Sequence, residues 1–146
     1  MPQMKINIHI LITYTFFTLF LCSFQHHDYT LASIPTDLKG TWKISSFSDL
    51  KKDTALHSLS ISLIIDPEGI CSGFLGCNNF RTTCKVRQDS ISFSDIIRGR
   101  KFCFKEYMDL EDHYIMVLSK ANRYYISKNM LFLFEGKKKL ATFIKE

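Results

Sequence analysis

Apolar and polar residues alternate along most of the chain after residue 39, and this pattern predicts β-strands. The clearest example is the segment 58–65, in which leucine or isoleucine occupies every second position and serine most of the positions between. Such alternation is typical of a strand that buries one face and exposes the other. The sequence Asp66-Pro67-Glu68-Gly69 then predicts a turn. Further strands are predicted at 40–44, 70–75, 80–86, 90–97, 122–127, 130–135 and 139–144.

The hydrophobic period changes in the segment 105–121, which predicts one amphipathic α-helix. Its apolar residues recur at spacings of three and four: Tyr107, Leu110, Tyr114, Val117, Leu118 and Ala121. Four acidic residues lie near the helix start, where the helix dipole favours negative charge: Glu106, Asp109, Glu111 and Asp112. The complete pattern predicts a mainly β domain, an antiparallel meander of about eight strands with the helix inserted before the last three.

Residues 1–32 have a different pattern, which predicts a secretory signal peptide. Lys5 supplies the positive charge of the N-terminal region, and an uncharged apolar run covers 8–24. Small residues at 30 and 32 fit a cleavage site after Ala32. The apolar run is at the short limit for spanning a bilayer, so an uncleaved anchor is the alternative. Cleavage after Ser23 is a second alternative. Removal of 1–32 leaves a single domain, 33–146.

Cys22 raises the further alternative of a bacterial lipoprotein. An acylated cysteine requires a small residue directly before it, whereas Leu21 is large. Lipidation, and with it the role of a secretion-system accessory lipoprotein, is therefore the less favoured interpretation.

Composition and charge narrow the function classes. The chain has 146 residues, of which 46% are hydrophobic and 23% charged, and its formal net charge is +5. This excludes a disordered acidic chain and a polytopic membrane protein. Two basic runs, 98–101 and 137–139, are suited to anionic lipid, lipopolysaccharide or nucleic acid. Export argues against nucleic acid, and lysines at 137–139 fit a solvated hairpin turn.

Four cysteines remain after the leader is removed: Cys71, Cys77, Cys84 and Cys103. Structural zinc sites typically use pairs of cysteines separated by two to four residues, and these four cysteines are not spaced in that way. We therefore expect disulfides and no metal or cofactor. A hairpin with loop 76–79 would place Cys71 opposite Cys84, at a separation compatible with a bridge. The turn at 66–69, however, would place Cys71 on the opposite face of the sheet from Leu59, Ile61 and Leu63. An odd loop, a bulge or a bridge on the outer face would reconcile the two.

The sequence contains no convincing catalytic constellation. A cysteine nucleophile needs a histidine, and only His57, in a polar linker, and His113, on the expected exposed face of the helix, remain after cleavage. The serine-hydrolase and phosphate-binding motifs are also absent from the sequence. We therefore predict a non-enzymatic protein without catalytic residues.

Three segments in order carry a family resemblance: Leu38-Lys39-Gly40-Thr41-Trp42, then 72–80 with Gly-Cys-Asn at its centre, then Arg100-Lys101-Phe102-Cys103. They resemble the META domain, also called HslJ-like, which typically shows G-x-W, G-x-x-G-C-N-x-[FY] and T-R-x-x-C. The matching positions are Gly40, Trp42, Gly73, Gly76, Cys77, Asn78, Phe80, Arg100 and Cys103. Gly99 stands where the family has threonine, Cys84 where members often carry an aromatic residue, and Cys71 lies outside the pattern.

The resemblance implies a small β-barrel and a location in the bacterial envelope, periplasmic or associated with the outer membrane. It also implies a link to stress, since the family includes a heat-shock protein, but no agreed catalytic residues. Pairing of Cys77 with Cys103 would join the two family-motif cysteines and stabilise the fold by about 3.5 kcal/mol in the chain-entropy model. Arg100, at the family's arginine position, is expected in a buried or barrel-end ion pair.

Two functions from different classes follow. The first is a non-catalytic envelope protein that binds another envelope protein or a membrane surface. The second is a lipocalin-like carrier of a small apolar ligand, because 40–42 also matches the G-x-W that opens lipocalins. Three strands after the helix and a bulky interior argue against the carrier. The residues expected to point inward are Trp42, Leu59, Ile61, Phe93, Phe132 and Phe134.

Overall fold

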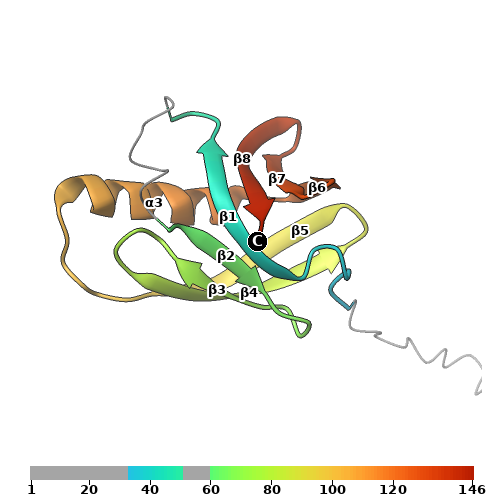
Figure 1. Cartoon of the computed structure of the whole chain (residues 1–146), viewed down its shortest axis with the longest axis horizontal. Coiled ribbons are helices and arrows are strands. Elements are labelled where there is room, and N and C mark those ends of the chain that lie inside the picture. The colour runs from blue at the N-terminus through green and yellow to red at the C-terminus, as the bar shows by residue number, and fades with distance from the viewer. Residues whose placement is uncertain (1–32, 51–59) are drawn as a thin grey trace, which may run out of the picture. The chain divides into compact units, whose positions relative to one another are not determined.

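The computed structural model of the chain describes residues 33–50 and 60–146. Its strands join in chain order into a closed antiparallel barrel, because β1 pairs with both β2 and β8 (Figure 1). A single helix, α3 (Lys105–Lys120), precedes the last three strands of this described part. The strands are β1 (Gly40–Phe47), β2 (Ser62–Ile65), β3 (Ile70–Phe74), β4 (Asn79–Arg87), β5 (Ser90–Arg98), β6 (Arg123–Ser127), β7 (Met130–Glu135) and β8 (Lys138–Lys145). The predicted fold class is confirmed.

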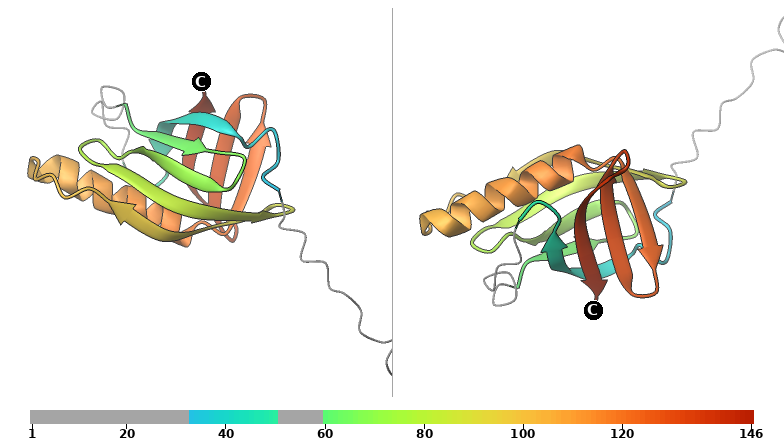
Figure 2. Two further views of the ribbon diagram at one scale, coloured as in Figure 1. Left: turned by 90° about the horizontal axis from the view of Figure 1, so that it is seen from below. Right: turned by 90° about the horizontal axis from the view of Figure 1, so that it is seen from above.

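Helix α3 covers the weakest seam of the barrel. Strands β5 and β6 share only the pairing of Ser90 with Arg123. The helix packs against β5, and Figure 2 shows it running alongside that strand. Its apolar stripe, with Tyr114, Val117 and Leu118 buried, therefore adds hydrophobic packing next to the strand whose pairing with β6 is short.

Bulky side chains fill the barrel interior. The ring of Tyr114 lies 5.6 Å from that of Phe47, 5.7 Å from Phe80 and 6.0 Å from Phe143, between ring centroids. Trp42 is fully buried, and its indole N–H donates to the carbonyl oxygen of Leu38 at 2.8 Å. Aromatic rings thus occupy the space in which a carrier would hold its ligand.

Three of the expected inward residues, Trp42, Ile61 and Phe93, are buried, and Leu59 lies outside the described residues. The prediction was wrong for Phe132 and Phe134 in β7, where Leu131 and Leu133 are the buried residues. Phe132 instead stacks against Tyr125 on the outer face, with ring centroids 6.1 Å apart. Every residue from 130 to 134 is apolar, so the sequence contains no alternation that could distinguish the two faces.

The register of β3 decides the position of Cys71. Strand β2 pairs Ile65 with Cys71, one residue beyond the expected Ile70, because the connection between them is one residue longer than the predicted turn. Within it, the backbone N–H of Ile70 donates to Asp66 Oδ1 at 2.7 Å. The odd loop brings Cys71 to the interior face, where it is fully buried.

Two sequence predictions fall outside this description. The predicted signal peptide at 1–32 and His57 lie among residues that the structure does not describe. In residues 33–50 and 60–146, α3 lacks the length and the apolar character that a membrane-spanning helix requires.

Candidate functional site

The turn between β3 and β4, residues 75–78, is the base of the site. Gly76 has φ +114°, a conformation that residues with a Cβ rarely adopt. The backbone N–H of Leu75 donates to the carbonyl oxygen of Asn78 at 2.8 Å and closes the turn. In this geometry the N–H groups of Cys77 and Asn78 are directed at helix α3.

Glu111 of α3 receives these N–H groups and is fully buried. Its Oε1 accepts hydrogen bonds from the backbone N–H of Cys77, at 3.1 Å, and from that of Asn78. Its Oε2 accepts one from Asn78 Nδ2 at 3.0 Å. Glu111 was expected only as one of several acidic residues near the helix start. It lies on the apolar stripe instead, three residues before Tyr114 and seven before Leu118, and a carboxylate at a stripe position was the available signal.

Asn78 connects the turn to the segment that precedes the helix. Its Oδ1 accepts from the backbone N–H of Lys101 at 2.8 Å, and its Nδ2 donates to the carbonyl oxygen of Lys101 at 3.1 Å. A Cβ at Gly99 would lie only 2.7 Å from the same Oδ1. Glycine in place of the family's threonine therefore leaves room for the side chain of Asn78.

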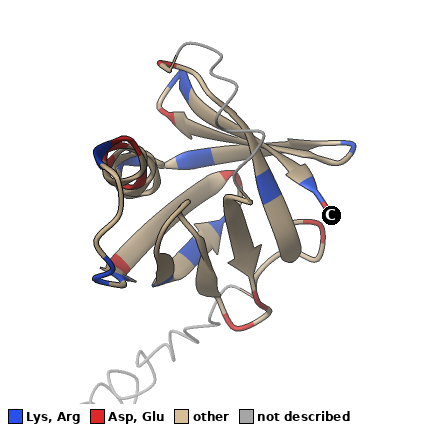
Figure 3. Cartoon of the chain, turned by 60° about the vertical axis from the view of Figure 1, so that its left-hand side comes forward, with Lys and Arg blue, Asp and Glu red and all other residues tan. Residues whose placement is uncertain are grey.

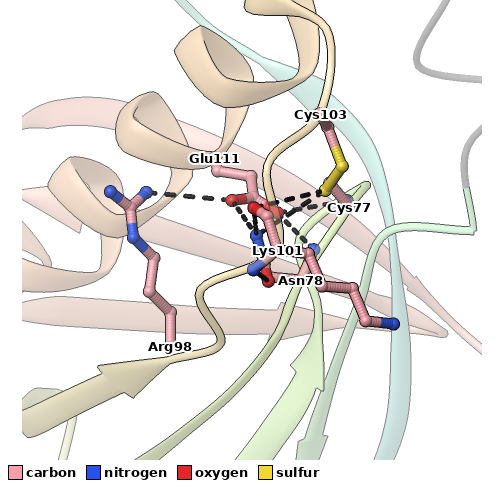
Figure 4. The surroundings of a disulfide bond; sticks show 6 residues. All are labelled: Cys77, Asn78, Arg98, Lys101, Cys103 and Glu111. Carbon is pink, nitrogen blue, oxygen red and sulfur yellow. Dashed lines mark hydrogen bonds and ion pairs between the residues drawn. A yellow bond between two sulfur atoms is a disulfide. The ribbon is translucent and has the colours of Figure 1, made fainter.

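A disulfide joins Cys77 of the turn to Cys103, as the resemblance implied. We call the six residues in Figure 4 the Glu111 cluster: Cys77, Asn78, Arg98, Lys101, Cys103 and Glu111. The cluster anchors the β5–α3 connection, residues 99–104, at two points, Lys101 and Cys103.

The arginine of the cluster is Arg98, and the expectation for Arg100 was wrong. Arg98 Nη1 lies 2.5 Å from Asp112 Oδ1 and 3.8 Å from Glu111 Oε2. Arg100 is exposed and has no ion pair within residues 33–50 and 60–146. Arg98 ends β5, beside which α3 packs, whereas Arg100 lies in the connection beyond it.

The second expected bridge, Cys71 with Cys84, is not formed, and both residues are buried free thiols. The β3–β4 register pairs Cys71 with Thr82, because the turn begins at Leu75, one residue earlier than expected. The side-chain interaction with Cys84, together with burial, raises the pKa of Cys71 above its usual range, and the same interaction lowers the pKa of Cys84.

We expect both thiols to resist alkylation in the folded protein, because Cys71 is 0% and Cys84 3% exposed. Iodoacetamide applied without reductant should label them only after unfolding in guanidinium, as read by peptide mass spectrometry. Cys77 and Cys103 should become labelled only when a reductant is added as well. Rapid labelling of Cys71 in the native protein would contradict the buried register of β3.

Of the two histidines considered for nucleophilic chemistry, His113 forms no hydrogen bond or ion pair that the structure describes with a member of the Glu111 cluster, and His57 lies outside the described residues. His113 was expected on an exposed helix face but is largely buried. Its ring meets that of Phe47 edge-on at 4.9 Å, and its Nε2 lies 3.1 Å from Asp49 Oδ1. The described residues contain no group of three or more histidine, cysteine or acidic side chains that could hold a metal ion.

The family-motif positions thus divide by role. Cys77, Asn78 and Cys103 meet in the cluster, with Gly76 shaping the turn, while Trp42 and Phe80 are core residues. Gly73 allows the close approach of β2, and Gly40, with φ +114°, begins β1. Chemically, both carboxylate oxygens of Glu111 are occupied by hydrogen bonds, so the cluster fixes backbone positions.

The chain is similar to known proteins in its sequence pattern and in its fold. Residues 36–146 match the family model of the META domain, whereas no curated protein shows significant similarity. An NMR structure of a protein from Burkholderia xenovorans is similar in fold, with TM-score 0.62 and 19% identity over 74% of this chain and 82% of that one. A crystal structure of a DUF4847 family protein from Bacteroides vulgatus gives TM-score 0.54 and 15% identity over 74% and 93% of the two chains.

Proposed function

The chain belongs to the META domain family, and from this we propose that it is an exported, non-catalytic protein of the bacterial envelope, periplasmic or attached to the outer membrane. It acts by binding another component of the envelope, and the family resemblance associates this role with stress. The observation that carries the proposal is the Cys77–Cys103 disulfide at the family motif. Disulfides persist in oxidising compartments and are rare in the cytosol, and the leader-like pattern of 1–32 points the same way.

The chemistry of the cluster supports a binding role over catalysis. General acid–base catalysis requires a titratable group within reach of a substrate. Glu111 is instead enclosed and accepts three hydrogen bonds from the turn. What the cluster presents to solvent is the β5–α3 connection, in which Arg100, Lys101 and Phe102 are exposed.

The carrier alternative receives less support. A ligand-binding barrel keeps an apolar cavity at its centre. Here Trp42, Tyr114 and Phe143, all fully buried, pack into the interior.

Cell fractionation with thiol trapping tests the proposal. The full chain should be recovered from the periplasmic or membrane fraction, shortened by the leader, with Cys77 and Cys103 protected from alkylation until a reductant is added. A control lacking residues 2–32 should stay in the cytosol and have both thiols reduced. Full-length chain in the cytosol with Cys77 and Cys103 reduced would refute export.

A further inference from the structure

Two phenylalanine side chains are exposed on the β5–α3 connection. Phe102 is 95% exposed and Phe104 77%, the highest values among the exposed large hydrophobic residues. Soluble proteins rarely expose neighbouring large apolar groups without a binding partner for them. The residue between them, Cys103, is turned toward the body of the domain by its bridge to Cys77. The high exposure of both rings shows that they face away from the barrel core.

The connection is held in this exposed form. Besides the disulfide, Lys101 is bound through both its N–H and its carbonyl oxygen by Asn78, at 2.8 and 3.1 Å. On the other side, the carbonyl oxygen of Phe104 accepts the first N–H groups of α3, from Tyr107 at 3.0 Å and Met108 at 3.2 Å. The backbone therefore cannot easily fold the two rings back onto the domain, and binding would cost little ordering entropy.

The charges next to the two rings that have no ion-pair partner in the described part of the chain are mainly basic. Arg98 and Lys105 are neutralised by Asp112 and Asp109 at 2.5 and 2.6 Å. Arg100 and Lys101, directly before Phe102, are exposed and have no ion pair in the described part of the chain. Three acidic residues of the helix are exposed: Asp109 and Asp112, which form these two ion pairs, and Glu106, which forms none in the described part of the chain. Figure 3 shows Lys and Arg positions gathered where the chain passes from β5 to the helix.

The shape of the β5–α3 connection favours a membrane surface over a protein as its binding partner. Figures 1 and 2 show the connection as a loop at the outer edge of the domain, beyond the barrel. A protein partner would have to supply a pocket for each projecting ring. The interface of a bilayer accepts aromatic rings from a convex edge, and its anionic phosphates attract the adjacent cations.

We propose that the β5–α3 connection docks the protein on bilayers rich in anionic phospholipid. Phe102 and Phe104 enter the interfacial layer, while Arg100 and Lys101 contact lipid phosphates. The inference rests on the proposed envelope location, which brings the chain within reach of such a surface. Binding would be reversible, since two rings and two cations provide a limited apolar area and charge.

Vesicle flotation tests the inference with the protein as recovered from the envelope. The vesicles are pure phosphatidylcholine or a three-to-one mixture with phosphatidylglycerol. The native protein should float with the mixed vesicles. Arg100→Gln/Lys101→Gln should reduce partitioning about 30-fold, since each cation contributes a factor of about five. Phe102→Ser/Phe104→Ser should reduce it at least about tenfold.

Matched variants control for general surface effects. Tyr125→Ser removes an aromatic side chain that is 59% exposed on β6, and Lys137→Gln/Lys138→Gln removes two exposed lysines. Both controls should float like the native protein, and thermal melts should show that all four variants are folded at the temperature of the assay. The samples are the protein from which the leader has been removed, since a retained leader would anchor every sample to both vesicle types.

Two outcomes would overturn the inference: flotation unaffected by the changes at 100–104, or equal flotation of native protein on both vesicle types. If native protein fails to float while the fractionation experiment finds it exported and oxidised, only the docking site is refuted. A cytosolic, reduced protein would refute the envelope function independently of the vesicle result.

Discussion

Replacement of Glu111 by alanine is expected to lower the free energy of unfolding by about 4 kcal/mol. The change removes the acceptor for the backbone N–H groups of Cys77 and Asn78 and for the amide of Asn78. These donors are enclosed, so each would lose a hydrogen bond without gaining water in return. Urea unfolding followed by circular dichroism, with the disulfide intact, measures the effect.

Two control variants test whether the loss of stability comes from the buried carboxylate of Glu111. Asp112→Ala removes a carboxylate that is 65% exposed and should cost no more than about 1 kcal/mol. Glu111→Gln keeps one acceptor oxygen and should fall between the two alanine variants. A Glu111→Ala protein as stable as Asp112→Ala would show that the buried carboxylate does not hold the turn.

A comparably large loss is expected for Gly73→Ala in β3. A Cβ at Gly73 would lie 2.0 Å from the carbonyl oxygen of Ser62 and 2.8 Å from Phe80 Cε1. The first of these atoms belongs to the backbone of β2, so the strand itself would have to move. Overpacking of this kind costs about 3 kcal/mol or more, and we expect a corresponding loss in the urea midpoint.

Gly136→Ala is the matched control. Gly136 lies in the β7–β8 turn, and no atom lies within 4 Å of the position of its Cβ. Its φ of +58° resembles that of Lys128 at 55°, so alanine should cost only about 1 kcal/mol. If Gly73→Ala loses no more stability than Gly136→Ala, the close approach of β2 would not be the reason for glycine at 73.

The strands and the helix could be predicted because most of them have a clear hydrophobic period. The alternation fails in β7, where both sides of the strand are apolar and only three-dimensional packing decides between Leu131 and Phe132. Registers could not be predicted reliably either, because they depend on loop lengths. A difference of one residue at the β3–β4 turn was enough to pair Cys71 with Thr82 instead of Cys84.

Only part of the candidate site could be predicted from the sequence. The motif identified Cys77, Asn78 and Cys103, which share one cluster. Two of its charged members, Glu111 and Arg98, lie outside the motif segments, and contact between a helix and a distant turn is a tertiary property. Glu111 could have been noticed as a charge on the apolar stripe, whereas the family motif pointed to Arg100 and no pattern in the sequence pointed to Arg98.

The pairing of β1 with β8 also bears on how the protein folds. The barrel cannot close until its last strand has been synthesised, since the first and last strands must meet. Contacts between such distant segments slow folding. A growing chain would therefore remain an open sheet with two unpaired edges until a late stage. That delay is compatible with the proposed export, in which the polypeptide would cross a membrane unfolded.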